Sequence, residues 1–562
     1  MSVPTIDRRI LFPLAGLLAS VTARAQWMSL AAIVLFLLSV GGVMHLIGLP
    51  VISALPWDMA IQLDGAWRIV HGQIPNVDFR AVIPPATLEL SALGIVLGSS
   101  SAACITTGNL LLFLALTPYA WVTARRRFSA AYAWLFAVFV GLMVLAPRPL
   151  GDKIAAASYA MLYNRQGYAL LSVIVVSVLV PVLPGVMKKP VLSGLGAGVL
   201  LALLAFSKLT FFAVGAAAIG LHVLFDRRAR IRVMAAVLIG CVGTVMLLHA
   251  ATGLDFMAYL RETEAIGRVY VQGKWKDVIE VTLKNLDQLF IVTALALLCA
   301  REPGDNRQSR PAWSKGTLLL SIGFLCASAL ALTATSAQRF ELPLCVVAGF
   351  MCVEWLRRGN TDRTAHPGIS TQASYVFGAI ILTPLLIGPL IGKDTGALLR
   401  AVKSSVGDNA QSVRAEAFHS EALYDFLILN DRTVVSELTP SQPASVYPGQ
   451  INDGIELVRQ HAGGDSRIIA LDFSNPFPFA LQLPPAHGGS TSWLLNGSFS
   501  RRDYPAPTVV FGDADLVMIP TYERNGTTVA ALMDIYGSYL ERNFRLIGQT
   551  GMWMLYERKK AG

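Results

Sequence analysis

The sequence predicts an α-helical polytopic membrane protein with about eleven transmembrane helices and a C-terminal water-soluble α/β domain. Three observations predict this fold class. Of the 562 residues, 54% are hydrophobic and 15% are charged, whereas a soluble globular domain has about 25% charged residues because its surface faces water. Long apolar runs fill 27–392, and 393–562 has the composition of a soluble protein. The ionisable residues of the first part gather between its apolar runs.

Eleven segments are apolar enough and long enough to cross a bilayer, which takes about 17–25 residues. They are 27–49, 103–124, 129–147, 167–187, 191–206, 209–225, 233–250, 284–300, 316–334, 341–357 and 373–392. A further segment, 81–98, contains Pro84-Pro85 and Glu89, so we expect it to be re-entrant or only partly inserted. The short apolar stretch 10–21 follows two arginines and is interpreted as an interfacial helix on the cytoplasmic face.

The distribution of Lys and Arg predicts the orientation of the spans, because basic loops stay on the cytoplasmic side. All the main basic clusters fall on one side of the membrane if 81–98 does not cross it. These clusters are Arg125–Arg127, Lys188-Lys189, Arg227-Arg228, the 301–315 loop and Arg357-Arg358. The N-terminus is then cytoplasmic, and the C-terminal part lies outside.

The net charge of +10 does not indicate nucleic-acid binding, because the basic residues sit in short runs between apolar segments and not in one patch. All six cysteines lie within or beside apolar segments. The C-terminal part therefore has no disulfide framework, and no Cys/His spacing indicates a zinc site.

The C-terminal part, 393–562, alternates helical and strand patterns, which is typical of a small α/β domain. The predicted elements are a helix over 411–429, an amphipathic helix over 451–462, a strand over 467–473, a strand over 515–520, a helix over 527–543 and a closing hairpin over 544–557. Gly548 and Gly551 mark the hairpin turn.

The first outer loop, 50–102, is the most informative stretch of the chain. It holds three acids, Asp58, Asp64 and Asp78, between two apolar spans. Residues 58–71 have helical spacing, and the apolar positions predict a helix that lies along the bilayer surface. Those expected to face the membrane are Ile61, Ala66, Ile69 and Val70.

This loop resembles that of the GT-C superfamily of membrane glycosyltransferases, which includes aminoarabinose transferase, protein O-mannosyltransferases and oligosaccharyltransferases. The family pattern is an acid, a Gly-x-x-Pro about fourteen residues later, an aromatic and a Pro-Pro. The matching residues are Asp58, Gly72, Pro75, Phe79 and Pro84-Pro85. Two other segments are similar to family features: a small-residue helix followed by Lys208, within 196–211, and a late outer turn over 336–344.

The resemblance implies a GT-C-like transmembrane domain over 1–392, with a catalytic first outer loop, in a bacterial inner membrane. The soluble domain is then periplasmic. The partners implied are membrane lipid, a polyprenyl-phosphate sugar as donor and a glycan, lipid or protein acceptor. The superfamily includes metal-dependent and metal-independent members, so the sequence leaves a divalent metal open and predicts no ligand set for one.

By the same resemblance Asp58 is the general base, and Asp152 and Asp64 are further candidate acids. An acceptor hydroxyl is a poor nucleophile, so a carboxylate must take its proton, and the departing phosphate needs cations. The candidate phosphate-binding cations on the outer side are Arg165, Arg261, Arg268, Lys274, Lys276, Arg339 and Lys208.

Three of these residues also have a purely structural interpretation. Asp58 can cap a surface helix, Asp152 can pair with its neighbour Lys153, and Lys208 can extend to the interface. The alternative function is a transporter or flippase for a lipid-linked glycan. Transporters tend to show repeated halves or charged, broken helices at mid-membrane, and the sequence shows neither. A third interpretation, a scaffold that presents the C-terminal part, leaves the acidic first loop unexplained.

Overall fold

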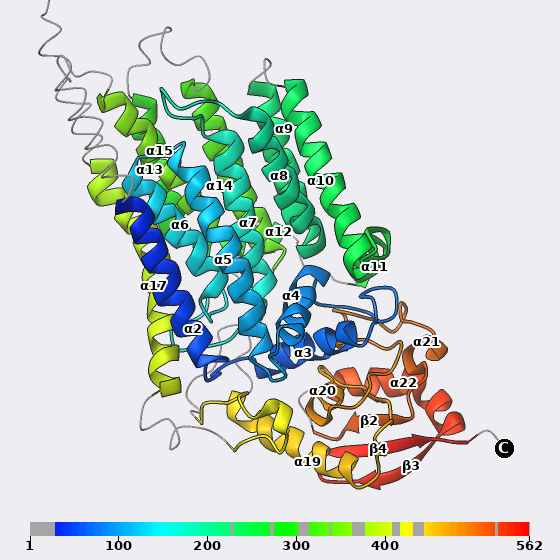
Figure 1. Ribbon diagram of the computed structural model, residues 1–562. Helices are drawn as coiled ribbons and strands as arrows, with labels where there is room; N and C mark the ends of the chain where they lie inside the picture. The colour runs from blue at the N-terminus through cyan, green and yellow to red at the C-terminus, as the bar shows by residue number, and fades with distance from the viewer. Residues whose placement is uncertain are drawn as a thin grey trace, which may run out of the picture.

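The computed structural model describes residues 28–225, 230–269, 275–301, 314–336, 338, 340–361, 377–406, 416–430, 443–522 and 526–560. Long helices run alongside one another in a bundle, and the C-terminal part covers one end of it (Figure 1). We call this end, which faces the C-terminal part (the tail), the tail-facing end. The interfacial helix expected over 10–21 lies outside the described residues.

Each of the eleven predicted spans contains a helix in the structure. The bundle helices are Met28–Ile47, which includes a π-helical turn and α2 (Gly42–Ile47), α5 (Cys104–Arg125), α6 (Ala130–Leu145), α7 (Leu162–Leu179), α8 (Pro190–Ser207), α9 (Leu209–Phe225), α10 (Arg230–Thr252), α13 (Leu286–Arg301), α14 (Lys315–Ala334), α15 (Pro343–Thr361) and α17 (Thr383–Val406).

Within the described residues, seven helices are long and apolar enough to cross a membrane. The count becomes eight if α12 (Trp275–Lys284) and α13, which meet at a bend of 75°, form one broken span. Helices α6 and α9 are apolar but shorter. The chain is therefore a multi-pass helical membrane protein, and the expected total of eleven crossings stays a prediction.

The outer helices expose apolar side chains, as a lipid-facing surface requires. In α10, Ile231 and Leu238 are 83% and 63% exposed. On its other side α10 packs closely against the small-residue helix α8, because a Cβ atom at Gly198 would lie 2.2 Å from the carbonyl oxygen of Val237. Small residues let two backbones approach in this way in membrane proteins.

Two short helices lie at the tail-facing end of the bundle, α3 (Pro56–Val70) and α4 (Pro85–Val96) (Figure 1). The 12 residues of α4 span about 18 Å, against a hydrocarbon core of about 30 Å. Its length agrees with the partial insertion expected for 81–98. Helix α11 (Phe256–Val269) follows α10 at the same end.

The C-terminal part contains a four-stranded sheet in the order β1-β2-β4-β3. The strands are β1 (Ile468–Ala470), β2 (Leu516–Pro520), β3 (Phe544–Gln549) and β4 (Trp553–Arg558), and the helices are α19 (Tyr447–Arg459), α20 (Phe477–Leu481), α21 (Pro507–Phe511) and α22 (Gly526–Asn543). β1 and β2 are parallel, and the other two pairings are antiparallel. The predicted strands, hairpin and two later helices are confirmed.

The helix predicted over 411–429 is wrong where the structure describes it. Residues 416–430 contain only a short 3₁₀ turn, Glu421–Leu423. Their apolar side chains pack instead from irregular backbone, and the ring of Phe418 stacks on that of Phe426 at a centroid distance of 5.2 Å. The expected boundary at 392/393 also falls within a helix, because α17 continues to Val406.

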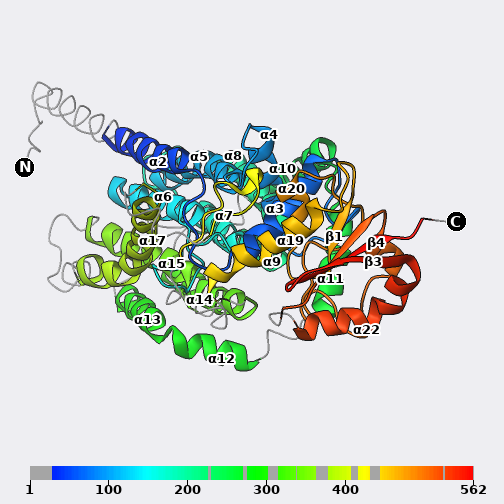
Figure 2. The same cartoon turned by 90° about the horizontal axis from the view of Figure 1, so that it is seen from below.

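The C-terminal part is fastened to the bundle through polar contacts. Asp425 accepts hydrogen bonds from the Ser101 hydroxyl and from the backbone N–H groups of Ala102 and Ala103, just before α5. Ile52 donates its N–H to the carbonyl of Leu427. Viewed from below, α19 and α20 lie over α3, and the sheet lies to one side of the bundle (Figure 2).

Candidate active site

Asp58 lies in the first turn of α3, which begins abruptly. Leu55, at the N-cap, has a φ of 52°, a left-handed conformation that a branched residue rarely adopts, and Pro56 follows it at the first helical position. Asp58 is partly exposed, whereas its neighbours Trp57 and Met59 are buried. The local backbone therefore holds a reachable carboxylate at the start of a fixed helix.

The predicted helix over 58–71 is confirmed, but the face assigned to the membrane is wrong for Ile61 and Ala66. Ile61 packs with Phe79 and Leu88, and Ala66 is fully buried. Val70 is exposed, as expected. Ile61 is buried by the rest of the outer loop and by α4. The C-terminal part also contacts the helix, where the Trp67 indole donates to the carbonyl of Leu483 over 2.9 Å.

A chain of buried polar side chains connects α3 to α7. Gln62, one turn after Asp58 and on the same face of the helix, donates to the Ser91 hydroxyl of α4 over 2.7 Å. One turn earlier on α4, Thr87 donates to Gln166 of α7, also over 2.7 Å. Buried polar groups held in this way fix the relative position of three helices.

Lys208 lies in the break between α8 and α9 and contacts α7. Its ammonium donates to the side-chain oxygen of Asn164 over 3.1 Å and lies 5.8 Å from the ring centroids of Tyr163 and Phe211. Asn164 follows Met161, which has a φ of 51° at the N-cap of α7. An ammonium has three donors, and in the described part of the chain Asn164 takes one.

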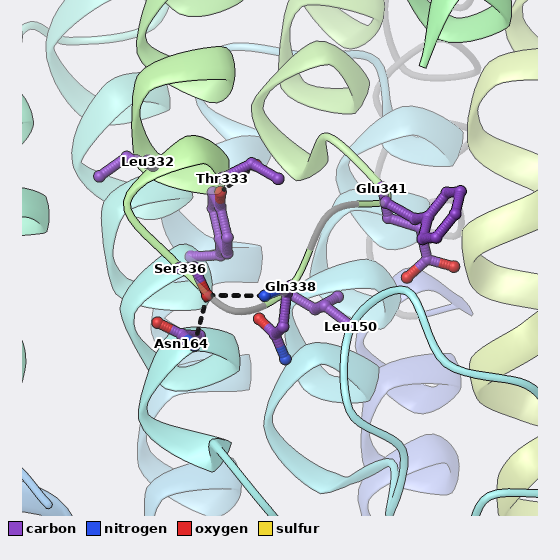
Figure 3. A pocket seen from close by; sticks show the side chains of 9 residues that line it. Leu150, Asn164, Leu332, Thr333, Ser336, Gln338 and Glu341 are labelled. Atoms are coloured by element: carbon purple, nitrogen blue, oxygen red, sulfur yellow. Dashed lines mark hydrogen bonds between the residues drawn. The ribbon is translucent and has the colours of Figure 1, made fainter. Parts of the chain in front are cut away.

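A narrow crevice continues from Asn164 toward the loop between α14 and α15 (Figure 3). Asn164 donates to the Ser336 hydroxyl over 3.2 Å, and Ser336 accepts the N–H of Gln338. The side-chain nitrogen of Gln338 is buried without a hydrogen-bond partner. The crevice has no room for a water molecule. The late outer turn over 336–344 thus meets the segment that holds Lys208, although the sequence did not single out Asn164 or Gln338.

Arg165, a predicted phosphate ligand, serves the interior of the protein. Its guanidinium donates to the carbonyls of Leu142, Met143 and Arg148 and makes two hydrogen bonds with Asp394. These five bonds use all five donors of an arginine. No donor is left for a phosphate in this structure, so we do not retain Arg165 in the site.

The partner of Arg165 belongs to a buried ionic cluster that the sequence did not reveal. Arg148 pairs with Glu341 at 3.0 Å and with Asp394 at 2.8 Å, and Lys393 pairs with Glu341 at 3.0 Å. Arg148 also donates to the backbone oxygen of Asp152. The opposite charges nearly balance, which is how buried charges are tolerated. The only sequence signal was the position of these residues beside outer turns.

The two other candidate acids are buried. Asp64 is fully enclosed and pairs with Arg68 at 3.2 Å, and Arg68 in turn donates to the carbonyls of Ala486 and Gly488. Burial raises the pKa of Asp64 to about 6, and Arg68 opposes this rise. Asp152 is 2% exposed, and one of its carboxylate oxygens accepts the N–H of Lys153. Both positions favour structural roles.

The other candidate cations are on the surface or undescribed. Arg261 and Lys276 are exposed. Arg268 is 60% exposed and pairs with Glu264 at 3.2 Å and with Asp503 at 3.4 Å. Lys274 and Arg339 lie outside the described residues. Among the residues that the structure does describe, no group of three or more His, Cys, Asp or Glu could hold a metal ion.

No protein-family model and no curated protein matches the chain. Solved structures that align with it include two of ArnT from Cupriavidus metallidurans, one in the apo state and one bound to undecaprenyl phosphate. Sequence identity is 12% and 11%, the TM-score is 0.47 for both, and the alignments cover 95% of this chain and 98% of the other. At a TM-score below 0.5 the similarity assigns no activity.

Proposed function

We propose that the protein is an inverting glycosyltransferase that moves a sugar from a polyprenyl-phosphate donor to a cell-envelope acceptor. The reaction takes place at the tail-facing end of the bundle, which corresponds to the periplasmic face of a bacterial inner membrane. The proposal rests on the residues of this chain and on the family pattern around Asp58.

One observation carries the proposal. Asp58 and Asn164, which accepts a hydrogen bond from the Lys208 ammonium, lie in the first turns of two helices that begin in the same unusual way. Leu55 precedes Asp58 and Met161 precedes Asn164, and both Leu55 and Met161 are left-handed. Such a conformation costs on the order of 1–3 kcal/mol at a non-glycine residue and is concentrated at functional sites. The buried chain through Gln62 and Thr87 fixes the two segments relative to each other.

The chemistry assigns one role to each group. Asp58 accepts the proton of the acceptor hydroxyl as its oxygen bonds to the anomeric carbon. The bond from that carbon to the phosphate oxygen breaks on the opposite side, so the configuration inverts and the polyprenyl phosphate leaves with the electron pair. Lys208 stabilises the phosphate with its two remaining donors.

Asp58→Asn tests the proposal because it keeps the side-chain shape and removes the proton acceptor. With purified protein and a panel of polyprenyl-phosphate sugars, we expect transfer to fall about 10²–10⁴-fold, the usual contribution of a positioned base. Binding of polyprenyl phosphate and the unfolding temperature should change little.

Asp255→Asn is the matched control. Asp255 accepts the N–H groups of Met257 and Ala258 at the start of α11, and asparagine caps a helix about as well as aspartate. This variant should retain transfer. Near-normal transfer by Asp58→Asn would show that Asp58 only stabilises its helix. Lipid translocation without transfer by the wild-type protein would favour the transporter.

A further inference from the structure

A cavity lies at the opposite end of the bundle, away from the C-terminal part. Its volume is about 150 Å³, and one water needs roughly 10–15 Å³. It is surrounded by the ends of α7, α8, α9, α10 and α14, which lie at the end remote from the sheet in Figure 1. Nothing in the proposed transfer reaction uses it.

The cavity wall contains a buried positive charge without a counter-ion. Arg127 is 3% exposed and donates only to neutral oxygens, those of Thr123, Ser177, Val180 and Ser193. No acid pairs with it in the described part of the chain. Burial lowers its pKa to about 10, so it is charged at neutral pH. A buried charge is normally paired, which points to an anion from outside the chain.

The rest of the lining has the same sign. Lys188 and Lys189 lie at the rim, Lys189 is the N-cap of α8, and no side chain caps the first turn of that helix. None of the described lining residues is acidic. The partial positive charge of a helix N-terminus adds to the attraction for an anion.

The apolar part of the cavity favours a lipid over a free ion. Phe225 and Val233 line it where α9 and α10 end and begin. The adjoining surface exposes Leu224 and Ile231, which are 66% and 83% exposed. A molecule with an anionic head and apolar chains fits both regions at once.

We propose that this cavity binds an anionic membrane phospholipid, with the headgroup phosphate between Arg127 and Lys188-Lys189 and the acyl chains along α9 and α10. The site is separate from the transfer site, because Lys208 lies at the other end of α8. The occupant stabilises the inner ends of five helices that otherwise surround an unpaired charge.

The test compares lipids on the purified full-length protein. Lipid retention by native mass spectrometry and the unfolding temperature are measured with phosphatidylglycerol, phosphatidylcholine and inorganic phosphate. We expect phosphatidylglycerol to bind and to raise the unfolding temperature. Lys188→Gln with Lys189→Gln should weaken this binding about tenfold or more, and these exposed positions leave the buried contacts of Arg127 intact.

Arg230→Gln with Arg232→Gln is the control, because these exposed cations lie at the same end but do not line the cavity. Equal losses in the two double variants would indicate general surface attraction and overturn the proposal. If phosphatidylcholine binds as well as phosphatidylglycerol, the proposed preference for an anionic headgroup is wrong. Competition by inorganic phosphate at equal concentration would replace the lipid with a free-phosphate site.

Discussion

At the scale of single residues, burial separates the ionisable groups that support the fold from those that can react. Arg165 and Asp64 resemble functional residues in the sequence because each lies near an outer loop. In the structure one has all its donors engaged and the other is fully enclosed. Asp58 and Lys208 retain partial exposure. One sequence cannot distinguish these cases, because burial of an outer-loop residue depends on contacts with residues hundreds of positions away.

Lys208→Gln should weaken donor binding, because glutamine removes the charge while its amide can still contact Asn164. A charge-assisted contact with phosphate is worth about 1.5–3 kcal/mol, so we expect affinity for polyprenyl phosphate to fall about ten- to a hundredfold. Calorimetry or native mass spectrometry measures this affinity. Lys276→Gln, at an exposed lysine on α12, is the control. Equal, small effects would move the phosphate site to another cation.

Asp64 should give the stability a pH dependence of unusual sign. Its pKa is near 3.8 in the unfolded chain and about 6 in the folded protein. The folded state therefore holds the proton more tightly between these values, and this group makes folding less favourable as pH rises from about 4 to 6. The change is roughly 3 kcal/mol over the window.

Thermal unfolding of the wild type and Asp64→Asn across this range isolates the effect. The difference in stability between the two proteins should change with pH below about 6 and become constant above it. A difference that is independent of pH would contradict the raised pKa.

At the scale of elements, the sequence pattern correctly predicted the helices and strands whose conformation depends mainly on local sequence. The hairpin of β3 and β4 formed where Gly548 and Gly551 indicated a turn, and α22 formed at the predicted place. The segment 416–430 did not form its predicted helix. It crosses a surface shared by α5 and α19, and Phe418 and Phe426 both pack against Tyr447. Such tertiary contacts override a local helical pattern.

Asp425 is the most testable contact between elements, because it holds the residues just before α5 from a distant segment. Asp425→Ala removes three hydrogen bonds and leaves N–H groups before α5 without their acceptor. We expect a loss of about 1–2 kcal/mol, seen as a lower unfolding temperature, and faster proteolysis near residue 425. Asp465→Ala, at an exposed turn of the C-terminal part, should change neither. Unchanged proteolysis in Asp425→Ala would show that other contacts fasten this segment.

At the scale of the whole molecule, the sequence predicted a polytopic helical membrane protein and about eleven crossings. All eleven apolar segments became helices, because lipid requires a helix to satisfy its own backbone. Among the described residues, length and composition select seven helices as spans, or eight if the bent pair of α12 and α13 is one span. The position of α3 could not be predicted, since it depends on contacts with the C-terminal part.

The predicted orientation can be tested directly with single cysteines at Ser129 and Ser466. Ser129 follows the Arg125–Arg127 cluster, and Ser466 precedes β1. The positive-inside rule places the first in the cytoplasm and the second outside. A membrane-impermeant maleimide applied to intact spheroplasts should therefore label only Ser466→Cys. Labelling of both positions from the same side would overturn the eleven-crossing arrangement.

The hydrogen bonds from α3 to the C-terminal part have a consequence for biosynthesis. Arg68 reaches the carbonyls of Ala486 and Gly488, 418 and 420 residues further along the chain, and Trp67 reaches Leu483. While the ribosome is still making the spans, these three carbonyl groups do not yet exist. The contacts of α3 with the C-terminal part therefore form only after residues 483–488 have been made, long after the first outer loop itself has been translated.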